Sequence, residues 1–247
     1  MKNKALLLLL LAATVAGCRF NTSKYSNDDD KGTPAGTVVH SSGGGVFNLD
    51  NKAGVKTARL NLEAGAIEVN LSDTTSKLFN AVVTDTTRKF ELSQLTTDSG
   101  EVVNFRMKEH KHKFDNDSSN VELRLNPNPQ WEIKLKVAAA QCTFDLSKFK
   151  ISKFGLNCAA GDVNVKLMPV LANTNVEINA SVAAITIRIP QDAACEIQLE
   201  SALADNDFPG FQKKGSDHYE TAGFATAKNK IHIKANCSLS SFNIERY

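Results

Sequence analysis

The sequence predicts an all-β protein whose regular part is a right-handed β-solenoid, a β-helix-like stack with coils of about 21 residues. One observation is a twelve-residue phrase that occurs five times, at 60–71, 135–146, 156–167, 178–189 and 233–244. The middle copies begin 21 and 22 residues apart (135, 156, 178), and a fixed period near this length indicates a solenoid. The other observation is a series of short alternating apolar segments across residues 46–130, with no long helical pattern among them.

The phrase alternates apolar and polar residues in two blocks around small residues. In the third copy slots one, eight, ten and twelve are apolar and hold Leu156, Val163, Val165 and Leu167. Gly161 stands at slot six, between the blocks. We therefore expect two short strands joined by a tight step that resets which face points inward. Because a coil buries its apolar face only against its neighbours, the core should be one continuous column through the stack.

The domain organisation follows from where the phrase is regular. Residues 46–130 hold strand-like segments at uneven spacing, so this N-terminal β region is either a set of irregular coils or a small antiparallel sheet that caps the solenoid. From Trp131 the period is regular, and we expect residues 131–247 to be the solenoid proper. An additional, incomplete copy of the phrase begins at Leu199, as the period predicts. The next complete copy begins only at Ile233, which places an insertion near 205–230.

The N-terminus has the pattern of a lipoprotein signal peptide. Residues 1–17 combine a short basic start with an apolar run and small residues before a cysteine. The run is too short for a transmembrane helix, which needs about 20 apolar residues. Val15-Ala-Gly-Cys18 resembles a bacterial lipobox, in which signal peptidase II cuts before the cysteine. That resemblance implies a lipidated Cys18 with a diacylglyceryl thioether and an acyl chain such as palmitate, and two or more chains give stable anchoring.

Residues 18–45 are expected to be the lipidated cysteine and a flexible tether, because polar and small residues dominate there. By resemblance to enterobacterial sorting, Arg19 after the lipidated cysteine favours the outer membrane over retention in the inner membrane. Asp28-Asp-Asp30 keeps the tether soluble, and it loosely resembles the acidic stretch that exports some lipoproteins to the cell surface. The sequence leaves the periplasmic and the surface face open as alternatives.

The charge balance argues against a nucleic-acid partner. The chain carries 29 basic and 27 acidic side chains, and removal of residues 1–17 would delete Lys2 and Lys4 and leave 27 of each. A nearly neutral domain has no long-range field that attracts nucleic acid or an anionic membrane. The expected partners are therefore the membrane, through the lipid on Cys18, and an envelope protein or glycan.

Four further cysteines stand in the solenoid region: Cys142, Cys158, Cys195 and Cys237. Disulfides form in exported proteins, so one or two bridges between coils are one possibility. The alternative, which we prefer, is that the cysteines are small apolar fillers. Cys142 and Cys158 occupy slots where other copies carry isoleucine, valine or leucine.

No residue pattern indicates catalysis, a cofactor or a metal site. His110-Lys-His112 is a close histidine pair with two aspartates nearby, and we interpret it as a solvated loop because further ligands at workable spacing are missing. His232 lies between two isoleucines of a strand and should point outward. Asp145 and Asp162 recur near the coil steps and are expected to accept turn amides rather than act as acids. We therefore expect no enzyme, no catalytic residues, no cofactor and no metal.

The insertion carries four aromatic residues within 17 positions: Phe208, Phe211, Tyr219 and Phe224. One interpretation, which we prefer, is that they fold back and cap the last coil. The other is that some of them stay exposed as a contact patch for a protein or a glycan.

Four segments in order carry a family resemblance: Trp131-Glu-Ile-Lys-Leu135, Phe144-Asp-Leu-Ser147, Cys158-Ala-Ala-Gly-Asp162 and Ile187-Arg-Ile-Pro190. They resemble the toast-rack family of β-solenoid domains of the bacterial envelope, similar to the C-terminal domain of LiaF-like stress-response regulators. The resemblance covers roughly residues 46–247 and implies a β-solenoid without catalytic residues. The chain departs from the pattern at Ala183-Ala184, where glycine is usual, and it lacks the transmembrane helices of LiaF-like regulators.

Three functions from different classes follow from these observations. The leading hypothesis is a non-enzymatic, lipid-anchored cell-envelope protein, a β-solenoid scaffold or interaction module in envelope homeostasis. The alternative is a lipoprotein that binds a glycan or another envelope polymer on a flat solenoid face. The third, a hydrolase of such polymers, requires a groove with two carboxylates at working separation.

Overall fold

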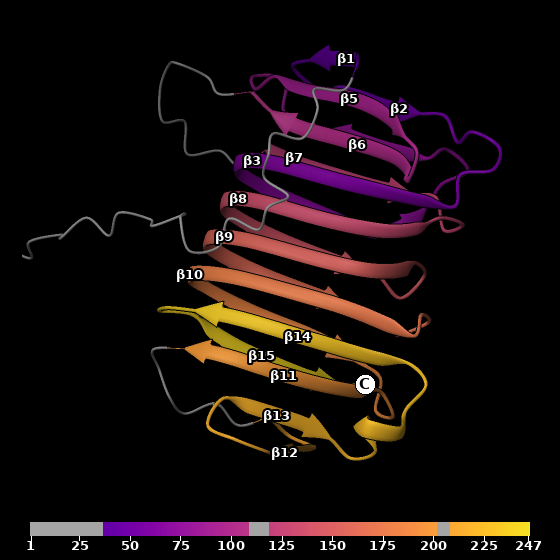
Figure 1. Cartoon of the computed structure of the whole chain (residues 1–247). Coiled ribbons are helices and arrows are strands. Elements are labelled where there is room, and N and C mark those ends of the chain that lie inside the picture. Colours follow the sequence, from indigo (N-terminus) through magenta and orange to yellow (C-terminus); the bar gives the residue numbers. More distant parts are fainter. Residues whose placement is uncertain (1–36, 109–118, 202–207) are drawn as a thin grey trace, which may run out of the picture. The chain divides into compact units, whose positions relative to one another are not determined.

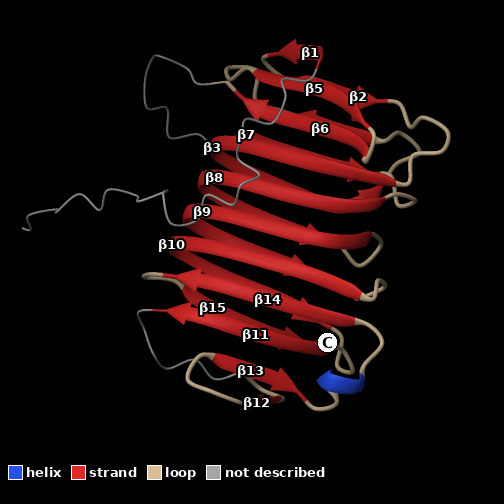
Figure 2. Ribbon diagram, viewed as in Figure 1, coloured by secondary structure: helices blue, strands red, loops and turns tan. Residues whose placement is uncertain are grey.

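Fifteen strands form a single open sheet in the part of the chain that the structure, a computed structural model, describes: residues 37–108, 119–201 and 208–247. Figure 2 shows strands nearly throughout the described residues, and the short 3₁₀ helix η3 (Phe224–Thr226) lies near the C-terminus. The described residues contain no helix that is long and apolar enough to cross a membrane. The predicted all-β, solenoid-like class is confirmed.

Four long strands form the centre of the sheet: β3 (Thr57–Thr74), β8 (Gln130–Asp145), β9 (Lys150–Lys166) and β10 (Asn173–Ile189). They run parallel to one another and pair along nearly their whole length. In Figure 1 the two halves of each strand lie one behind the other and are joined by a bend. A coil is therefore one bent strand and a short turn. Most residues between successive copies of the phrase belong to the N-terminal half of the next strand, as Ile151 and Phe154 do in β9.

The bend resets the side-chain alternation, as the small residues in the phrase predict. In β8 the odd-numbered residues are buried as far as Val137, and the even-numbered residues are buried from Ala140 onward. At this point the ladder between β8 and β9 skips Ala138 and Ala159. A shift of one position in a period-two pattern exchanges the two faces, so both halves of each strand turn apolar side chains to the same core.

The structural register confirms the three middle copies of the phrase and corrects the outer two. The first residues of the middle copies share one register position on β8, β9 and β10. On β3 that position belongs to Leu62 rather than Leu60, and in the last copy it belongs to Ala235 rather than Ile233. Because side chains alternate with a period of two, a slip of two residues leaves the inward set unchanged, and the pattern cannot reveal it.

The core is the continuous column that the phrase predicts. Leu146, Leu167 and Ile189 close successive coils, and each side chain is at most 1% exposed. The backbone N–H of Leu146 donates to the carbonyl of Lys166, and that of Leu167 donates to the carbonyl of Arg188, both at 2.8 Å. Burying an aliphatic side chain of this size contributes roughly 1.5–3 kcal/mol, and each coil supplies several.

Six strands cap the N-terminal end of the column: β1 (Thr37–Ser42), β2 (Gly45–Leu49), β4 (Phe79–Val83), β5 (Phe90–Thr97), β6 (Gly100–Met107) and β7 (Ser119–Leu125). β6 and β7 pair parallel with the two halves of β3. Beyond them β5 and β1 on one side, and β4 and β2 on the other, pair antiparallel. Residues 46–130 therefore combine the two arrangements that the sequence left open: β3 is a coil, and β2, β4 and β5 add an antiparallel cap to it through β6 and β7.

A group of phenylalanines fills the space between the two halves of this cap. Phe105 lies 5.1 Å from Phe47, 5.4 Å from Phe79 and 5.3 Å from Phe90, measured between ring centroids. All four side chains are at most 1% exposed. Aromatic pairs at these separations add to the stabilisation from burial alone.

The predicted tether of residues 18–45 is too long at its C-terminal end. Residues 37–42 form β1 and pair antiparallel with β5. Backbone hydrogen bonds to the edge of an existing sheet order this segment, and such bonds do not require apolar side chains. The expected boundary at residue 131 is likewise no break, because β3 is a full coil and shares one apolar core with β8.

The C-terminal end has an inverted strand order. Its strands are β11 (Ala194–Ser201), β12 (Phe211–Lys213), β13 (His218–Thr221), β14 (Lys230–Cys237) and β15 (Ser241–Arg246). β14 lies between β10 and β11 and pairs parallel with both, and β15 pairs with the C-terminal half of β10. The phrase that begins at Leu199 is therefore not stacked directly on β10. The insertion carries the chain outward, and the β14 strand that follows it returns to fill the position between β10 and β11.

Candidate functional site

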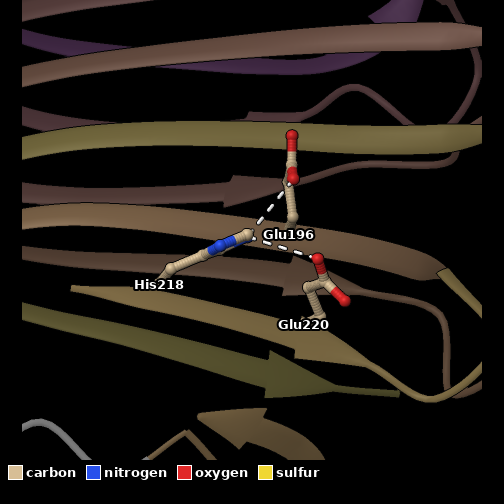
Figure 3. A group of neighbouring side chains, drawn as sticks. All are labelled: Glu196, His218 and Glu220. Carbon is tan, nitrogen blue, oxygen red and sulfur yellow. Dashed lines mark ion pairs between the residues drawn. The ribbon is translucent and has the colours of Figure 1, made fainter. Parts of the chain in front are cut away.

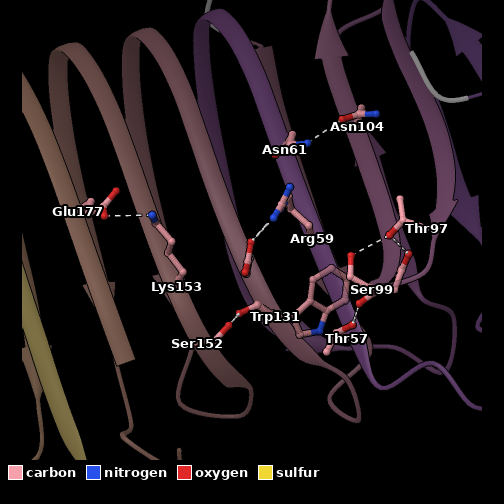
Figure 4. A network of polar contacts seen from close by, with 12 residues as sticks. Thr57, Arg59, Asn61, Thr97, Ser99, Asn104, Trp131, Ser152, Lys153 and Glu177 are labelled. Atoms are coloured by element: carbon pink, nitrogen blue, oxygen red, sulfur yellow. Dashed lines mark hydrogen bonds and ion pairs between the residues drawn. The ribbon is translucent and has the colours of Figure 1, made fainter. Parts of the chain in front are cut away.

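The outward side of the N-terminal strand halves, here called the first face, is charged. Arg59 on β3 pairs with Glu132 on β8 at 2.7 Å, and Lys153 on β9 pairs with Glu177 on β10 at 3.0 Å (Figure 4). Exposed ion pairs of this kind contribute about 0–1 kcal/mol each. These pairs therefore add little to the stability of the fold. They make cations and anions alternate from strand to strand across this surface.

The outward side of the C-terminal strand halves, here called the second face, carries a row of uncharged polar side chains. One register position on five adjacent strands, β3, β8, β9, β10 and β15, holds Asn70, Thr143, Asn164, Thr186 and Asn243. All five are exposed or half-exposed. Because neighbouring strands lie about 4.8 Å apart, the row presents amides and hydroxyls at a regular spacing.

Three of the four aromatic residues of the insertion, Phe208, Phe211 and Tyr219, close the C-terminal end of the core. Phe208 is 3% exposed, and its ring centroid lies 5.0 Å from that of Tyr219 and 5.8 Å from that of Phe242 on β15. Tyr219 and Phe224 are also buried, and Phe211 is half-buried against the core. This geometry matches the capping interpretation. Three of the four side chains are buried and not available as a contact patch. Phe208 and Tyr219 fill the open end of the last coil, whereas Phe224 packs against His232 on the outward side.

A cluster of imidazole and carboxylate groups lies on the first face where the insertion meets the last coil. Glu196 on β11 stands opposite Glu220 on β13, and His218 lies two residues from Glu220 on the same side of the strand. His218 Nε2 is 3.3 Å from Glu196 Oε2 and 3.4 Å from Glu220 Oε1. Figure 3 shows the imidazole pointing between the two carboxylates. The candidate ligand atoms of the three residues lie within 4.8 Å of one another.

His232 on β14 completes this cluster on its other side. It stands opposite Glu196 in the parallel ladder, and its Nδ1 lies 2.6 Å from Glu196 Oε1. Since a carboxylate can only accept, the Nδ1–H donates. The other ring nitrogen contacts Asn173 at 3.1 Å, and the ring of Phe224 lies edge-on to the imidazole with centroids 5.6 Å apart. The outward orientation predicted for His232 is confirmed.

Neither carboxylate of the cluster pairs with a lysine or an arginine in the described part of the chain. The ion-pair partners of Glu196 are His218 and His232, and the partner of Glu220 is His218. On the same face, by contrast, Glu132 and Glu177 pair with permanent cations. The cluster therefore has the donor set of a metal site, nitrogen and oxygen, rather than that of the surrounding ion pairs.

The carboxylates that the sequence placed near the coil steps have structural roles. Asp145 Oδ1 accepts hydrogen bonds from the backbone N–H and the hydroxyl of Ser147. Burial alone would raise the pKa of Asp145, but these bonds and the charge of Lys166 lower it below its ordinary value. Asp162 accepts from the side-chain amide of Asn164 at 2.6 Å. The prediction that Asp145 accepts a turn amide is confirmed, whereas Asp162 accepts a side-chain amide instead.

Glu101 on β6 is the most buried of the described carboxylates, at 3% exposed. Burial raises its pKa, and hydrogen bonds from Lys52, Gln94 and Thr96 more than offset this and lower it. A carboxyl group held ionised by three donors is suited to fixing strands, since a general acid requires a raised pKa.

An open depression of about 700 Å³ lies at the C-terminal end, lined by Gln191, Pro209, Gly210, Ile244, Glu245 and Arg246. The guanidinium of Arg246 donates to the backbone carbonyls of Gln191 and Ala193. These N–H groups fix the turn after β10, and hydrogen bonds to the protein occupy donors that could otherwise bind a ligand in the depression.

The four cysteines are free and buried. Burial raises the pKa of the Cys142 thiol to about 12 and that of Cys237 to about 11. It raises the pKa of Cys158 and Cys195 as well. A buried thiol with a raised pKa is a poor nucleophile and packs as a small apolar group, which is the interpretation that we preferred over disulfide bridges.

Several predicted features lie outside the described residues. These are the signal peptide of residues 1–17, the lipidation site at Cys18, the tether as far as residue 36 and the His110-Lys-His112 pair. The sequence pattern predicted no metal site and did not reveal the cluster of Glu196, His218 and Glu220. A signal was present, because His218-Tyr-Glu220 places two ligand types on one side of a strand. What could not be foreseen was that β13 would lie beside β11.

Comparisons with known proteins agree with this architecture. The family model for the N-terminal domain of toast-rack proteins matches residues 36–188, more than half of the chain. The crystal structure of a candidate cell adhesion protein from Clostridium sporogenes is similar, with a TM-score of 0.70 and 20% identity, over 85% of this chain and 100% of that chain. At this identity the likeness shows the fold alone.

A candidate adhesin from Bacteroides fragilis aligns over 82% of this chain and 97% of its own, with 10% identity and a TM-score of 0.25, and carries no argument here. No curated protein matches the sequence. The family match and the stacked, bent strands agree with the resemblance of the four sequence segments. The chain therefore belongs to the toast-rack family.

Proposed function

We propose that this toast-rack protein is a non-enzymatic, lipid-anchored protein of the bacterial cell envelope that acts as an interaction module in envelope homeostasis. The observation that carries the proposal is the uncharged row on the second face, exposed along one continuous core. Asn70, Thr143, Asn164, Thr186 and Asn243 form this row across five adjacent strands.

The proposal includes a location for the protein, the outer membrane of the cell. Residues 1–17 have the pattern of a lipoprotein signal peptide, and Cys18 would carry the lipid. Arg19 supports sorting to the outer membrane.

A second candidate function, binding of a glycan or another envelope polymer, is favoured by the second face. Polyhydroxylated ligands need closely spaced hydrogen-bond donors and acceptors, and asparagine and threonine supply both. The row repeats at the strand spacing and so suits an extended, repetitive ligand better than a compact one. Ion pairs flank the row on the same face, where Lys166 pairs with Asp145 and Arg188 with Glu245.

The lipid anchor is tested by replacing the cysteine that would carry it. Cells that express the wild-type chain should incorporate a palmitate analogue into it and retain it in the membrane fraction. In Cys18→Ala both the label and the retention should disappear, because the thioether cannot form. Cys142→Ala is the matched control and should keep both. A labelled Cys18→Ala protein would contradict the anchor.

The binding surface is tested with charge placed on one face at a time. Asn164→Lys combined with Thr186→Lys should abolish sedimentation of the protein with isolated envelopes or envelope polysaccharide, because two cations would interrupt the uncharged row. Asn157→Lys combined with Asn179→Lys adds the same charge to the first face of the same two strands, and binding should persist. Equal loss in both double variants would rule out the second face as the binding surface.

A further inference from the structure

We propose that Glu196, His218 and Glu220 form a binding site for Zn²⁺. The three side chains project from two paired strands, β11 and β13, toward a common point (Figure 3). Their exposed fractions are 30%, 41% and 25%, so the point is open to solvent. This site is independent of the uncharged row on the second face.

The spacing of the ligand atoms fits a tetrahedral ion. Zinc binds imidazole nitrogen and carboxylate oxygen at about 2.0–2.1 Å, and a tetrahedron with such bonds has edges of about 3.3–3.4 Å. His218 Nε2 lies 3.3 Å from Glu196 Oε2 and 3.4 Å from Glu220 Oε1. Two of the three edges among these ligands therefore already have the required length. The third, between the carboxylates, closes by rotation of Glu220 about its side-chain bonds, since all three atoms lie within 4.8 Å.

The donor set selects the ion. An imidazole nitrogen is a good ligand for zinc and a poor one for Ca²⁺ or Mg²⁺, which prefer oxygen ligands only. Two carboxylates match the double charge of the ion, and in the described residues no lysine or arginine pairs with either of them. Three protein ligands leave the fourth position for water or for a donor from a partner.

His232 is a positioning residue of this site. Its Nδ1–H donates to Glu196 Oε1 at 2.6 Å, which leaves Oε2 turned toward His218. Contacts to Asn173 and to the ring of Phe224 in turn fix the imidazole. A hydrogen bond to the second oxygen of a ligating carboxylate is the usual outer-shell arrangement, and its loss costs about 10- to 100-fold in metal affinity.

The test is a zinc titration of the purified full-length protein near neutral pH, in competition with a chromophoric chelator. We expect one Zn²⁺ per chain, with no response to Ca²⁺ or Mg²⁺. Co²⁺ at the same site should give the visible absorption bands of a tetrahedral complex. His218→Ala and the isosteric Glu220→Gln should each weaken zinc binding by at least about 10-fold, and His232→Gln by about 10-fold.

Two controls separate this site from other histidines. His40→Ala removes an exposed histidine on β1, and the double change of His110 and His112 to alanine removes the pair outside the described residues. Both variants should bind zinc like the wild type, and circular dichroism should show every variant folded. The proposal is overturned if the wild type binds no stoichiometric zinc. It is equally overturned if the folded His218→Ala and Glu220→Gln variants keep wild-type affinity, or if the His110/His112 variant loses the binding.

Discussion

At the scale of single residues, the bend in each strand depends on side chains that are small enough for the neighbouring backbone. Gly161 on β9 has φ +140°, a backbone conformation that L side chains rarely adopt. A Cβ there would also overlap the carbonyl of Ala140 on β8. The small residue in the middle of the phrase is thus required by close strand contact as well as by conformation.

Gly161→Ala should lower the free energy of unfolding by more than about 1 kcal/mol, because the substitution is strained and overlaps backbone atoms that cannot move aside. Urea denaturation measures the effect. Gly155→Ala is the matched control on the same strand, where the added Cβ meets its nearest neighbour at 3.8 Å. That variant should be unchanged or stabilised by about 0.4–1 kcal/mol. Equal losses in both variants would contradict the role assigned to the bend.

Burial of the Cys142 thiol should make the free energy of unfolding fall as the pH rises into the alkaline range. Its pKa rises from 9.0 to about 12 on folding, chiefly through burial. The folded thiol holds its proton more tightly than the unfolded thiol, so its contribution is complete below pH 9.0 and declines as the pH rises toward 12. Cys142→Val, which introduces the residue that the next coil carries at Val163, should flatten this decline by up to about 1.4 kcal/mol per pH unit. Urea midpoints measured across this pH range for both proteins provide the check, and parallel curves would refute it.

At the scale of elements, the C-terminal strands hold the end of the stack together. β14 supplies the hydrogen-bonding partners of β10 on one side and of β11 on the other. Ile231 and Ile233 continue the inward column and are at most 2% exposed. The last segment of the chain therefore occupies an interior position in the sheet, although the periodic pattern would place it at the end.

A chain that ends at residue 229 lacks β14 and should lose cooperative folding. The hydrogen-bonding edges of β10 and β11 that pair with β14 would both be left without a partner. Circular dichroism and a thermal melt would report this. If the coils were stacked in sequence order, the same truncation would leave β11 on β10 and a shorter but folded solenoid. A cooperative melt of the truncated chain would thus contradict the inverted order.

At the scale of the whole molecule, stability is distributed along the stack. Each central strand has a paired neighbour on both sides, whereas β1 and β12 pair on one side only. In a stack of this kind the free energy of opening depends on how many neighbours a unit loses.

Amide hydrogen exchange should therefore be slowest in β8, β9 and β10 and fastest in β1 and β12. Mass spectrometry of peptic fragments can follow this gradient. Leu156→Ala removes a side chain that is 1% exposed and should cost about 2–5 kcal/mol. It should accelerate exchange in β8 and β10 as well as in β9, because those strands supply its contacts. Uniform exchange rates along the chain would contradict the view that the stability of each strand depends on its paired neighbours.

Much of the fold is encoded locally and could be predicted. Alternation around a small residue predicts the bent strand, as Val163 and Val165 show after Gly161, because period-two burial is a property of neighbouring residues. The same reasoning identified the cysteines as core residues. It placed His232 outward correctly but gave no hint of its partner, since Glu196 lies in another coil.

The sequence by itself determined the all-β class, the coil length, the inward residues and the family resemblance, because each is written in short-range periodicity. Only the tertiary structure decided the true register of the outer copies, the inversion that puts β14 between β10 and β11, and the meeting of Glu196 with His218 and Glu220. The physical reason is the same for all three. Strands that slip by two residues or exchange places keep the same inward faces, so which of them pair is settled by contacts between distant segments.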